Sequence, residues 1–232
     1  MNIVLTIAVG EAYQSISKLT HPTLSSYAKS IGADFLVVSE QKISKLHPDY
    51  EKFVVHDLLK TYDRVLLIDT DVIVRPDCPN LFDLVPENKL GMYDEGLLTT
   101  PEEKAVHRRT MELAFSQHSN FPMPEMWDHR FYNFGLAVIS KIHLDLFLPP
   151  KIETFGNYWA QSYFNVVLQK NKTEMFDIGH KFNRMPYVDS KVNEHRLKSY
   201  IVHYAGIQEV GDLIQTDLAL WDTYLRNPEY FL

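Results

Sequence analysis

The chain has 232 residues, of which 45% are hydrophobic and 23% charged, a composition that excludes a disordered protein and suits one α/β domain. Its formal net charge of −7 gives no global electrostatic reason to bind nucleic acid or an anionic membrane, so we expect neither partner. The only cysteine, Cys78, excludes an intramolecular disulfide. No apolar stretch approaches ~18 residues, so we expect no transmembrane segment and a cytoplasmic location.

Short apolar runs alternate with helical patterns in the first third of the chain. Three runs predict strands buried on both faces, at residues 3–9, 35–38 and 65–68. Two segments carry apolar residues at helical spacing, at residues 15–30 and 53–61, although Pro22 is expected to interrupt the first. The alternation predicts the α/β class, with a Rossmann-like, mixed but mostly parallel sheet and helices on both faces.

The rest of the chain is less regular but continues the alternation. We predict strands at residues 136–139 and 199–204, and helices at 101–117, 158–170 and 212–224. Thr100 and Pro101 are typical of a helix start, which supports the first of these helices. No internal repeat or linker-like change of composition is present, so we expect a single domain.

Asp69 and Asp71 directly follow the third predicted strand. In open α/β sheets, ligands bind beyond the carboxyl ends of the strands, and these two acids would lie there. Two neighbouring carboxylates repel each other unless a positive charge lies between them, and a divalent cation is the usual solution. Such an ion could hold a diphosphate and neutralise it as it departs. Acidic residues also cap ordinary turns, so the pair alone does not establish a metal site.

Two enzyme classes place such a pair after a buried strand. In phosphohydrolases of the haloacid dehalogenase type, Asp69 would be the nucleophile and Asp71 the acid or base. That class needs a second acidic pair at a strand end and carries its motif after the first strand, and the sequence shows neither feature. In glycosyltransferases the pair binds metal and lies in the middle of the first half of the chain, which is also its position in this sequence. A non-catalytic nucleotide-sugar-binding protein is the third alternative.

Three later segments complete the pattern, at residues 131–139, 159–165 and 201–206. Together with Asp69-Thr70-Asp71, their order resembles glycosyltransferase family 8, a retaining group that includes glycogenin and bacterial lipopolysaccharide galactosyl- and glucosyltransferases. The resemblance implies one GT-A type domain over residues 1–232, with a nucleotide-binding half at about 1–95 and an acceptor-side half at about 96–232. It implies metal-dependent hexose transfer from a nucleotide diphosphate sugar, UDP-sugar being favoured, to a glycan or other hydroxyl acceptor.

The resemblance also implies roles for individual residues. The metal ligands would be Asp69, Asp71 and His203, and the imidazole among them favours Mn²⁺ over Mg²⁺. The donor would contact Thr6, Ala8, Tyr13, Lys52, Asp69, Thr70, Asn133 and Gly135. Gln161 would lie under the anomeric carbon of the donor and Asp94 would face the acceptor, with Glu95 as a reserve carboxylate. Gln161 and Asp94 are therefore the candidate catalytic residues.

The sequence departs from the family pattern at two places. The family carries acids on both sides of the glutamine, whereas this chain has Ala160 and Ser162. Residues 207–209 also stand where the family has a Lys-Pro-Trp that grips the diphosphate. Another cation would have to replace that lysine, and the candidates are Lys52, Lys191 and Arg196. Nothing in the sequence specifies the sugars or an oligomeric state.

Overall fold

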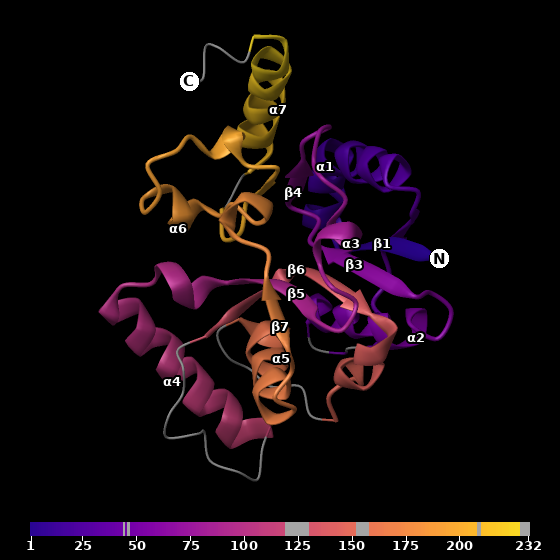
Figure 1. Cartoon of the computed structure of the whole chain (residues 1–232), viewed down its shortest axis with the longest axis vertical. Helices are drawn as coiled ribbons and strands as arrows, with labels where there is room; N and C mark the ends of the chain where they lie inside the picture. The colour runs from indigo at the N-terminus through magenta and orange to yellow at the C-terminus, as the bar shows by residue number, and fades with distance from the viewer. Residues whose placement is uncertain (44, 46, 119–129, 152–157, 208–209, 228–232) are drawn as a thin grey trace.

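A mixed sheet forms the centre of the molecule (Figure 1). The computed structural model describes residues 1–43, 45, 47–118, 130–151, 158–207 and 210–227. The strands are β1 (Asn2–Ile7), β2 (Asp34–Val38), β3 (Arg64–Ile68), β4 (Val72–Val74), β5 (Leu90–Asp94), β6 (Tyr132–Ser140), β7 (Met175–Asp177) and β8 (Ile201–His203). The α-helices are α1 (Glu11–Ser30), α2 (Val55–Leu58), α3 (Leu81–Leu84), α4 (Pro101–His118), α5 (Trp159–Lys170), α6 (Pro186–Asp189) and α7 (Gly211–Arg226).

Six of the described strands form this sheet in the order β2-β1-β3-β6-β5-β7. β1 pairs in parallel with β2 and β3, and β5 pairs in parallel with β7, whereas β6 runs antiparallel to both of its neighbours. This confirms the mixed, mostly parallel sheet expected from the sequence. β4 and β8 form a separate antiparallel pair, which joins the segment after β3 to a segment near the end of the chain.

Apolar side chains fill both faces of the sheet. Along β3, Val65 and Leu67 pack in a cluster that also contains residues of α5, while Leu66 and Ile68 pack in a second cluster with residues of α1 and α3. Figure 1 shows α1 and α5 on opposite sides of the sheet. Because the strand is buried on both faces, its sequence is continuously apolar rather than alternating, which is why it could be predicted.

Two predicted helices differ from those in the structure. The expected interruption at Pro22 is wrong, because α1 runs through it. Thr20 and Leu24 are buried on α1 and hold it in place around the proline, so tertiary packing outweighs the missing N–H donor. The second predicted helix, at residues 53–61, is instead the end of a 3₁₀ helix, η1 (Pro48–Val54), followed by the short α2.

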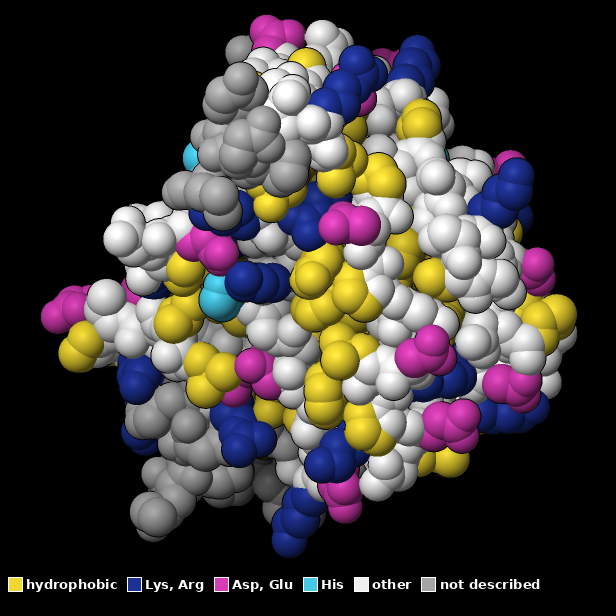
Figure 2. Space-filling model, turned by 45° about the horizontal axis from the view of Figure 1, so that its top comes forward, with side chains coloured by type: hydrophobic (Ala, Val, Ile, Leu, Met, Phe, Trp, Pro, Cys, Tyr) yellow, Lys and Arg dark blue, Asp and Glu magenta, His cyan; other side chains and the backbone are white. Residues whose placement is uncertain are grey.

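On the face seen in Figure 2, a central band of hydrophobic side chains is flanked by acidic and basic side chains that intermix. The net charge of −7 is therefore not gathered into a single-sign field on this face. Within the described ranges, no helix has the length and apolar character needed to cross a bilayer.

Candidate active site

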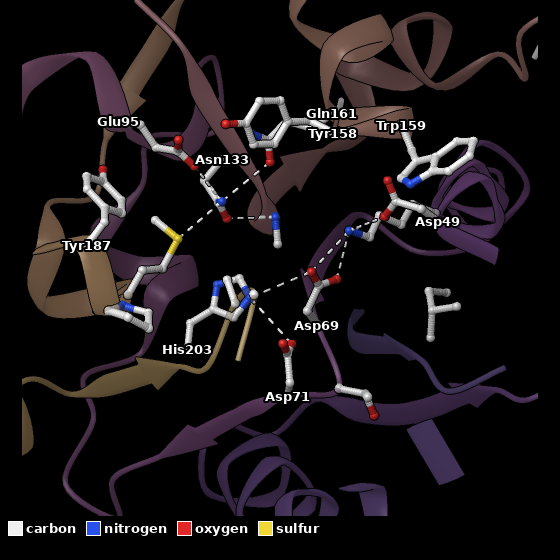
Figure 3. A pocket seen from close by; sticks show the side chains of 18 of the residues that line it. Asp49, Asp69, Asp71, Glu95, Asn133, Tyr158, Trp159, Gln161, Tyr187 and His203 are labelled. Atoms are coloured by element: carbon white, nitrogen blue, oxygen red, sulfur yellow. Dashed lines mark hydrogen bonds and ion pairs between the residues drawn. The ribbon is translucent and has the colours of Figure 1, made fainter. Parts of the chain in front are cut away.

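The pairing of β4 with β8 brings the three predicted metal ligands together. Asp69 and Asp71 lie between β3 and β4, and His203 is the last residue of β8, opposite Val72. His203 Nε2 lies 3.8 Å from Asp69 Oδ2 and 3.4 Å from Asp71 Oδ1 (Figure 3). One ligand atom from each residue lies within 4.8 Å of the other two. Two carboxylate oxygens and one imidazole nitrogen at this spacing suit a divalent transition metal such as Mn²⁺.

Gly135 makes the space in which this triad fits. A Cβ atom at this position would collide with His203 Cε1 and would lie 2.8 Å from Asp69 Oδ2. The glycine is therefore required by the close approach of two side chains rather than by an unusual backbone angle. The cradle that it leaves, together with the donor set, fits the metal that the resemblance implies.

A buried asparagine, Asn183, fixes the orientation of His203 and is itself oriented by Asn133. Asn133 Oδ1 accepts a hydrogen bond from the Gly135 N–H at 2.9 Å and another from Asn183 Nδ2 at 3.0 Å. The oxygen of Asn183 must therefore face His203 Nδ1, which lies 2.8 Å away. We assign the Nδ1–H of His203 to this bond, which leaves Nε2 to face the two carboxylates. A ring held in this way presents the correct nitrogen to a metal.

Replacing Asn183 with alanine is expected to lower the affinity for Mn²⁺ by about 10- to 100-fold, because His203 loses the partner that fixes its ring. Titration calorimetry with Mn²⁺ alone measures this effect. Asn165→Ala is the matched control, since Asn165 is also buried but bonds the backbone of Tyr132 and Gln161. Equal Mn²⁺ affinities for the two variants would refute the role given to Asn183.

Lys52 lies between Asp69 and a second carboxylate, Asp49, and neutralises their charge. Its ammonium lies 2.6 Å from Asp49 Oδ1 and 2.8 Å from Asp69 Oδ1, and it donates to the Phe134 carbonyl at 3.1 Å. Burial alone would lower the pKa of Lys52, but the two carboxylates outweigh burial and raise it. The lysine is therefore charged and fixes the position of Asp69 in the candidate metal site.

The charges of the triad itself depend on one another. Burial disfavours an ionised Asp71, but the neighbouring His203 outweighs this effect and lowers the pKa of the carboxyl. Burial likewise opposes protonation of His203, and Asp71 and Asp69 outweigh it and raise the pKa of the imidazole. Without a metal, a proton on His203 supplies the positive charge that the carboxylates need. A divalent cation would take over that role.

A pocket of about 580 Å³ surrounds the triad, and most of the predicted donor residues line it. They are Tyr13, Lys52, Asp69, Thr70, Asn133 and Gly135. Gln161 also lines the pocket; its amide oxygen accepts the Phe134 N–H at 3.0 Å, and its buried Nε2 has no hydrogen-bond partner within the described part of the chain. An unsatisfied buried N–H₂ group is costly, so this donor is suited to a ligand.

The structure does not bring the other two predicted donor residues into the pocket. Thr6 and Ala8 are buried on one side of the strand end, whereas their neighbours Ile7 and Val9 line the pocket. Side chains alternate along an extended chain, so neighbouring residues lie on opposite faces. Contact of Thr6 and Ala8 with the donor stays a prediction.

The carboxylate predicted to face the acceptor, Asp94, also lies next to a pocket residue rather than in the pocket. Asp94 does not line the pocket: its Oδ1 accepts the backbone N–H groups of Gly96 and Phe131 at 2.9 and 3.1 Å and so holds the turn after β5. Glu95 lines the pocket instead, and its Oε1 accepts from Asn133 Nδ2 at 2.7 Å. Glu95 is thus the carboxylate placed to meet a ligand, and Asp94 has a structural position.

The cations proposed for the diphosphate already have partners. Lys191 pairs with Glu103, a pocket-lining residue, so it lies near the pocket. Arg196 does not line the pocket, because its guanidinium makes two hydrogen bonds of 2.8 Å to the buried Asp217. Residues 208–209, in the segment that replaces the family's Lys-Pro-Trp, lie outside the described residues.

Two residues that shape the site, Asp49 and Asn183, could not have been identified from sequence patterns. Asp49 Oδ2 accepts the N–H of Ala160 at 3.0 Å, so a carboxylate from η1 lies at the start of α5, where this chain lacks the family's acid. Asp49 and Ala160 are 111 positions apart, and no local pattern links them. Asn183 has no sequence signal either, because its role depends on a contact with a residue of β8.

Two consecutive aromatic residues at the pocket rim have left-handed backbone. Tyr158 has φ 69° and Trp159 has φ 38°, and both side chains line the pocket. The indole of Trp159 stacks on His47 with 4.2 Å between ring centroids. Left-handed backbone in a non-glycine residue costs about 1–3 kcal/mol, and such strain is concentrated at functional sites.

Burial raises the pKa of Glu95 to about 7, although its hydrogen bond from Asn133 favours the ionised form. In the unfolded chain the value is 4.5, so the folded protein holds this proton more tightly. The stability that Glu95 contributes is therefore complete below about pH 4.5 and is lost as the pH rises to about 7.

Glu95→Gln is expected to raise the free energy of unfolding by up to about 3 kcal/mol at alkaline pH and to change it little in acid, because the amide has no charge to desolvate. Urea unfolding of the metal-free protein on each side of this range tests the prediction. Glu112→Gln, at a half-exposed position on α4, should show no such pH dependence. An equal effect of Glu95→Gln in acid and alkali would contradict it.

No protein-family model matches the chain, and a comparison with curated protein sequences finds no match. Solved structures do match. A glycosyltransferase involved in glycosylation of the major capsid of PBCV-1 has TM-score 0.59 and 12% identity, with 93% of this chain and 98% of that chain covered. The galactosyltransferase LgtC, solved with donor and acceptor sugar analogs, has TM-score 0.52 and 13% identity, with 96% of each chain covered. GlyE of Streptococcus pneumoniae TIGR4 has TM-score 0.53 and 12% identity, with 97% and 63% covered. The chain thus has the GT-A fold of these glycosyltransferases.

Proposed function

We propose that this chain is a metal-dependent glycosyltransferase that moves a hexose from a nucleotide diphosphate sugar, with UDP-sugar favoured, to a hydroxyl acceptor. The observation that carries the proposal is the convergence of Asp69, Asp71 and His203 in the pocket of a GT-A fold. The two halves of the proposed single domain both supply ligands, since the aspartates precede residue 95 and the histidine follows it. Family 8 remains the group that the motifs resemble.

The residues of the pocket divide the work of binding. Asp69, Asp71 and His203 would hold a metal, preferably Mn²⁺, which supplies positive charge against the departing diphosphate when bound. Tyr13 offers an aromatic face for the nucleobase. Burial raises the pKa of Tyr13, and the negative charges of Asp71 and Asp69 raise it further, so the ring lies near the two aspartates. Gln161 Nε2, which has no hydrogen-bond partner among the described residues, would donate to an oxygen of the donor.

Retention is the stereochemical outcome that we propose, by attack of the acceptor from the face that the diphosphate leaves. Gln161 lies in the pocket but its neutral amide is a weak nucleophile, so a covalent intermediate on it is disfavoured. The acceptor's proton would pass to the departing phosphate as the bond to the anomeric carbon breaks. Glu95 is an alternative base, because it lines the pocket and burial raises its pKa to about 7.

Calorimetric titration with UDP and with GDP, each with and without Mn²⁺, tests the donor site. We expect UDP to bind tightly only with Mn²⁺, and Asp71→Ala and His203→Ala each to weaken this binding by more than about 100-fold. Asp222→Ala is the control, since Asp222 pairs with Arg226 at exposed positions of α7 and does not line the pocket.

Three outcomes would decide between the alternatives. Absence of nucleotide binding with phosphate release from a generic phosphate ester would support the phosphohydrolase. Manganese-dependent UDP binding without hydrolysis or transfer of any UDP-hexose would support a non-catalytic binding protein. Hydrolysis of one UDP-hexose that requires Asp71 would support the transferase, because water can replace a missing acceptor.

A further inference from the structure

The pocket continues beyond the metal ligands in two directions. In Figure 3, Asp49 and Trp159 lie on one side of the triad, and Glu95 and Tyr187 lie on the other. Tyr13 follows β1, which contacts the η1 segment of Asp49, whereas Glu95 follows β5, which lies beyond β3 and β6 in the sheet. The proposed nucleobase end therefore lies on the Asp49 side. The Glu95 end is therefore available for the groups beyond the diphosphate.

Glu95 and His107 face each other across a gap at this end. His107 Nε2, from α4, lies 3.8 Å from Glu95 Oε2, too far for a direct hydrogen bond. The other oxygen of Glu95 is held by Asn133, and both Glu95 and His107 are more than nine-tenths buried while lining the pocket. Two polar groups at this separation can both bond one oxygen atom that lies beside the line joining them, on the pocket side.

The protonation of His107 determines which oxygen fits. Its ring stacks on Phe131 at 4.4 Å between centroids, and its Nδ1 is buried with no hydrogen-bond partner among the residues described. We assign the imidazole proton to Nε2, because an N–H at Nδ1 would be buried and unpaired. An oxygen in the gap can then accept from His107 and donate to Glu95. A hydroxyl does both, whereas a carboxylate can only accept and is repelled by Glu95.

Aromatic rings flank this pair of groups. Tyr187 and Tyr158 lie on either side of Glu95 and both line the pocket (Figure 3). The Tyr187 hydroxyl bonds Tyr93 at 3.2 Å, which anchors its ring. Such rings pack well against the C–H face of a sugar while polar groups select its hydroxyls. The nearby Glu103 is paired with Lys191, so it adds no unpaired charge.

We propose that Glu95, His107 and Tyr187 form an acceptor subsite for a neutral sugar, one hydroxyl of which bridges Glu95 and His107. This inference rests on the proposed function, because it takes the acceptor to lie across the metal ligands from the nucleotide. It narrows the acceptor from any hydroxyl compound to an uncharged glycoside.

The test compares neutral and anionic forms of the same sugars. The full chain with Mn²⁺ and UDP is titrated at about pH 8, where Glu95 is ionised, with methyl β-glucoside and methyl β-galactoside and with the corresponding uronides. We expect at least one neutral glycoside to bind about tenfold more tightly than its uronide. His107→Phe keeps a stacked ring but removes the Nε2–H, and should weaken neutral binding about tenfold.

Glu95→Gln gives the more diagnostic result, because it should reduce the preference for the neutral sugar over the uronide by about tenfold. A merely structural role for Glu95 would leave that preference unchanged. Arg108→Ala, at an exposed position of α4 next to His107, should change the affinity for neither the glycoside nor the uronide. UDP titration of each variant checks that the donor site is intact.

The inference is overturned if no glycoside binds while UDP does, if glycoside and uronide bind equally, or if Glu95→Gln leaves the preference unchanged. Failure of UDP to bind would instead count against the proposed function. The glycosides are then titrated without nucleotide, and the same comparison of neutral and anionic forms still decides the inference.

Discussion

Gly135→Ala should reduce Mn²⁺-dependent UDP binding by at least about tenfold and cost about 1–3 kcal/mol of stability. The added Cβ would collide with His203, and it would lie 2.8 Å from Asp69 Oδ2 and 2.9 Å from Asn133 Oδ1. These three side chains are fixed by the buried network that holds the triad, so none can move without losing a hydrogen bond or an ion pair. Calorimetry and urea unfolding measure the two effects.

Gly91→Ala separates the loss of binding from the loss of stability. Gly91 lies in β5, which pairs with β6, and a Cβ there would lie 2.6 Å from Val85 Cγ2. The added methyl group therefore disturbs the core but not the triad, so stability should fall while UDP affinity stays unchanged. If both variants lost stability and neither lost affinity, Gly135 would be a packing position only.

The sequence predicted the sheet and the metal ligands for different reasons. β3 is fully buried on both faces, and burial of that kind leaves a continuous apolar run in the sequence. The triad was expected from the resemblance, and the structure brings its members together through β4 and β8. Each of these strands has only three residues, and the paired residues Val72 and His203 are far apart in the sequence. No local pattern predicts a pairing so short and so distant.

The predicted site residues that lie outside the pocket are each adjacent to a residue that lines it. Asp94 and Glu95 are adjacent carboxylates, and only the turn after β5 decides which one faces the pocket. The Asp94 side chain accepts a hydrogen bond from the N–H of Gly96, two residues further on, as aspartate commonly does at a turn. The Asp-Glu-Gly sequence at residues 94–96 carries this signal, but the sequence analysis chose Asp94 from the family resemblance. The position of His107 carried no such signal, because it depends on how α4 packs.

Lys52→Met should lower the free energy of unfolding of the metal-free protein by about 3–5 kcal/mol, because it leaves two carboxylates close together without their cation. Lys52 is 5% exposed and lies within 3 Å of oxygens of both Asp49 and Asp69. The effect should be smaller with Mn²⁺ present, since the metal restores a positive charge beside Asp69 and binds only the folded chain. Urea unfolding with chelator and with Mn²⁺ provides both values.

Lys60→Met is the matched control, because its ion pair with Asp57 is exposed and should contribute less than about 1 kcal/mol. A second substitution tests the cause. If the loss in Lys52→Met comes from repulsion between the carboxylates, adding Asp49→Asn should recover part of it, and the two substitutions will not be additive. Additive losses would instead mean that Lys52 stabilises the fold by packing its aliphatic chain, and that Asp69 needs no lysine to hold its charge.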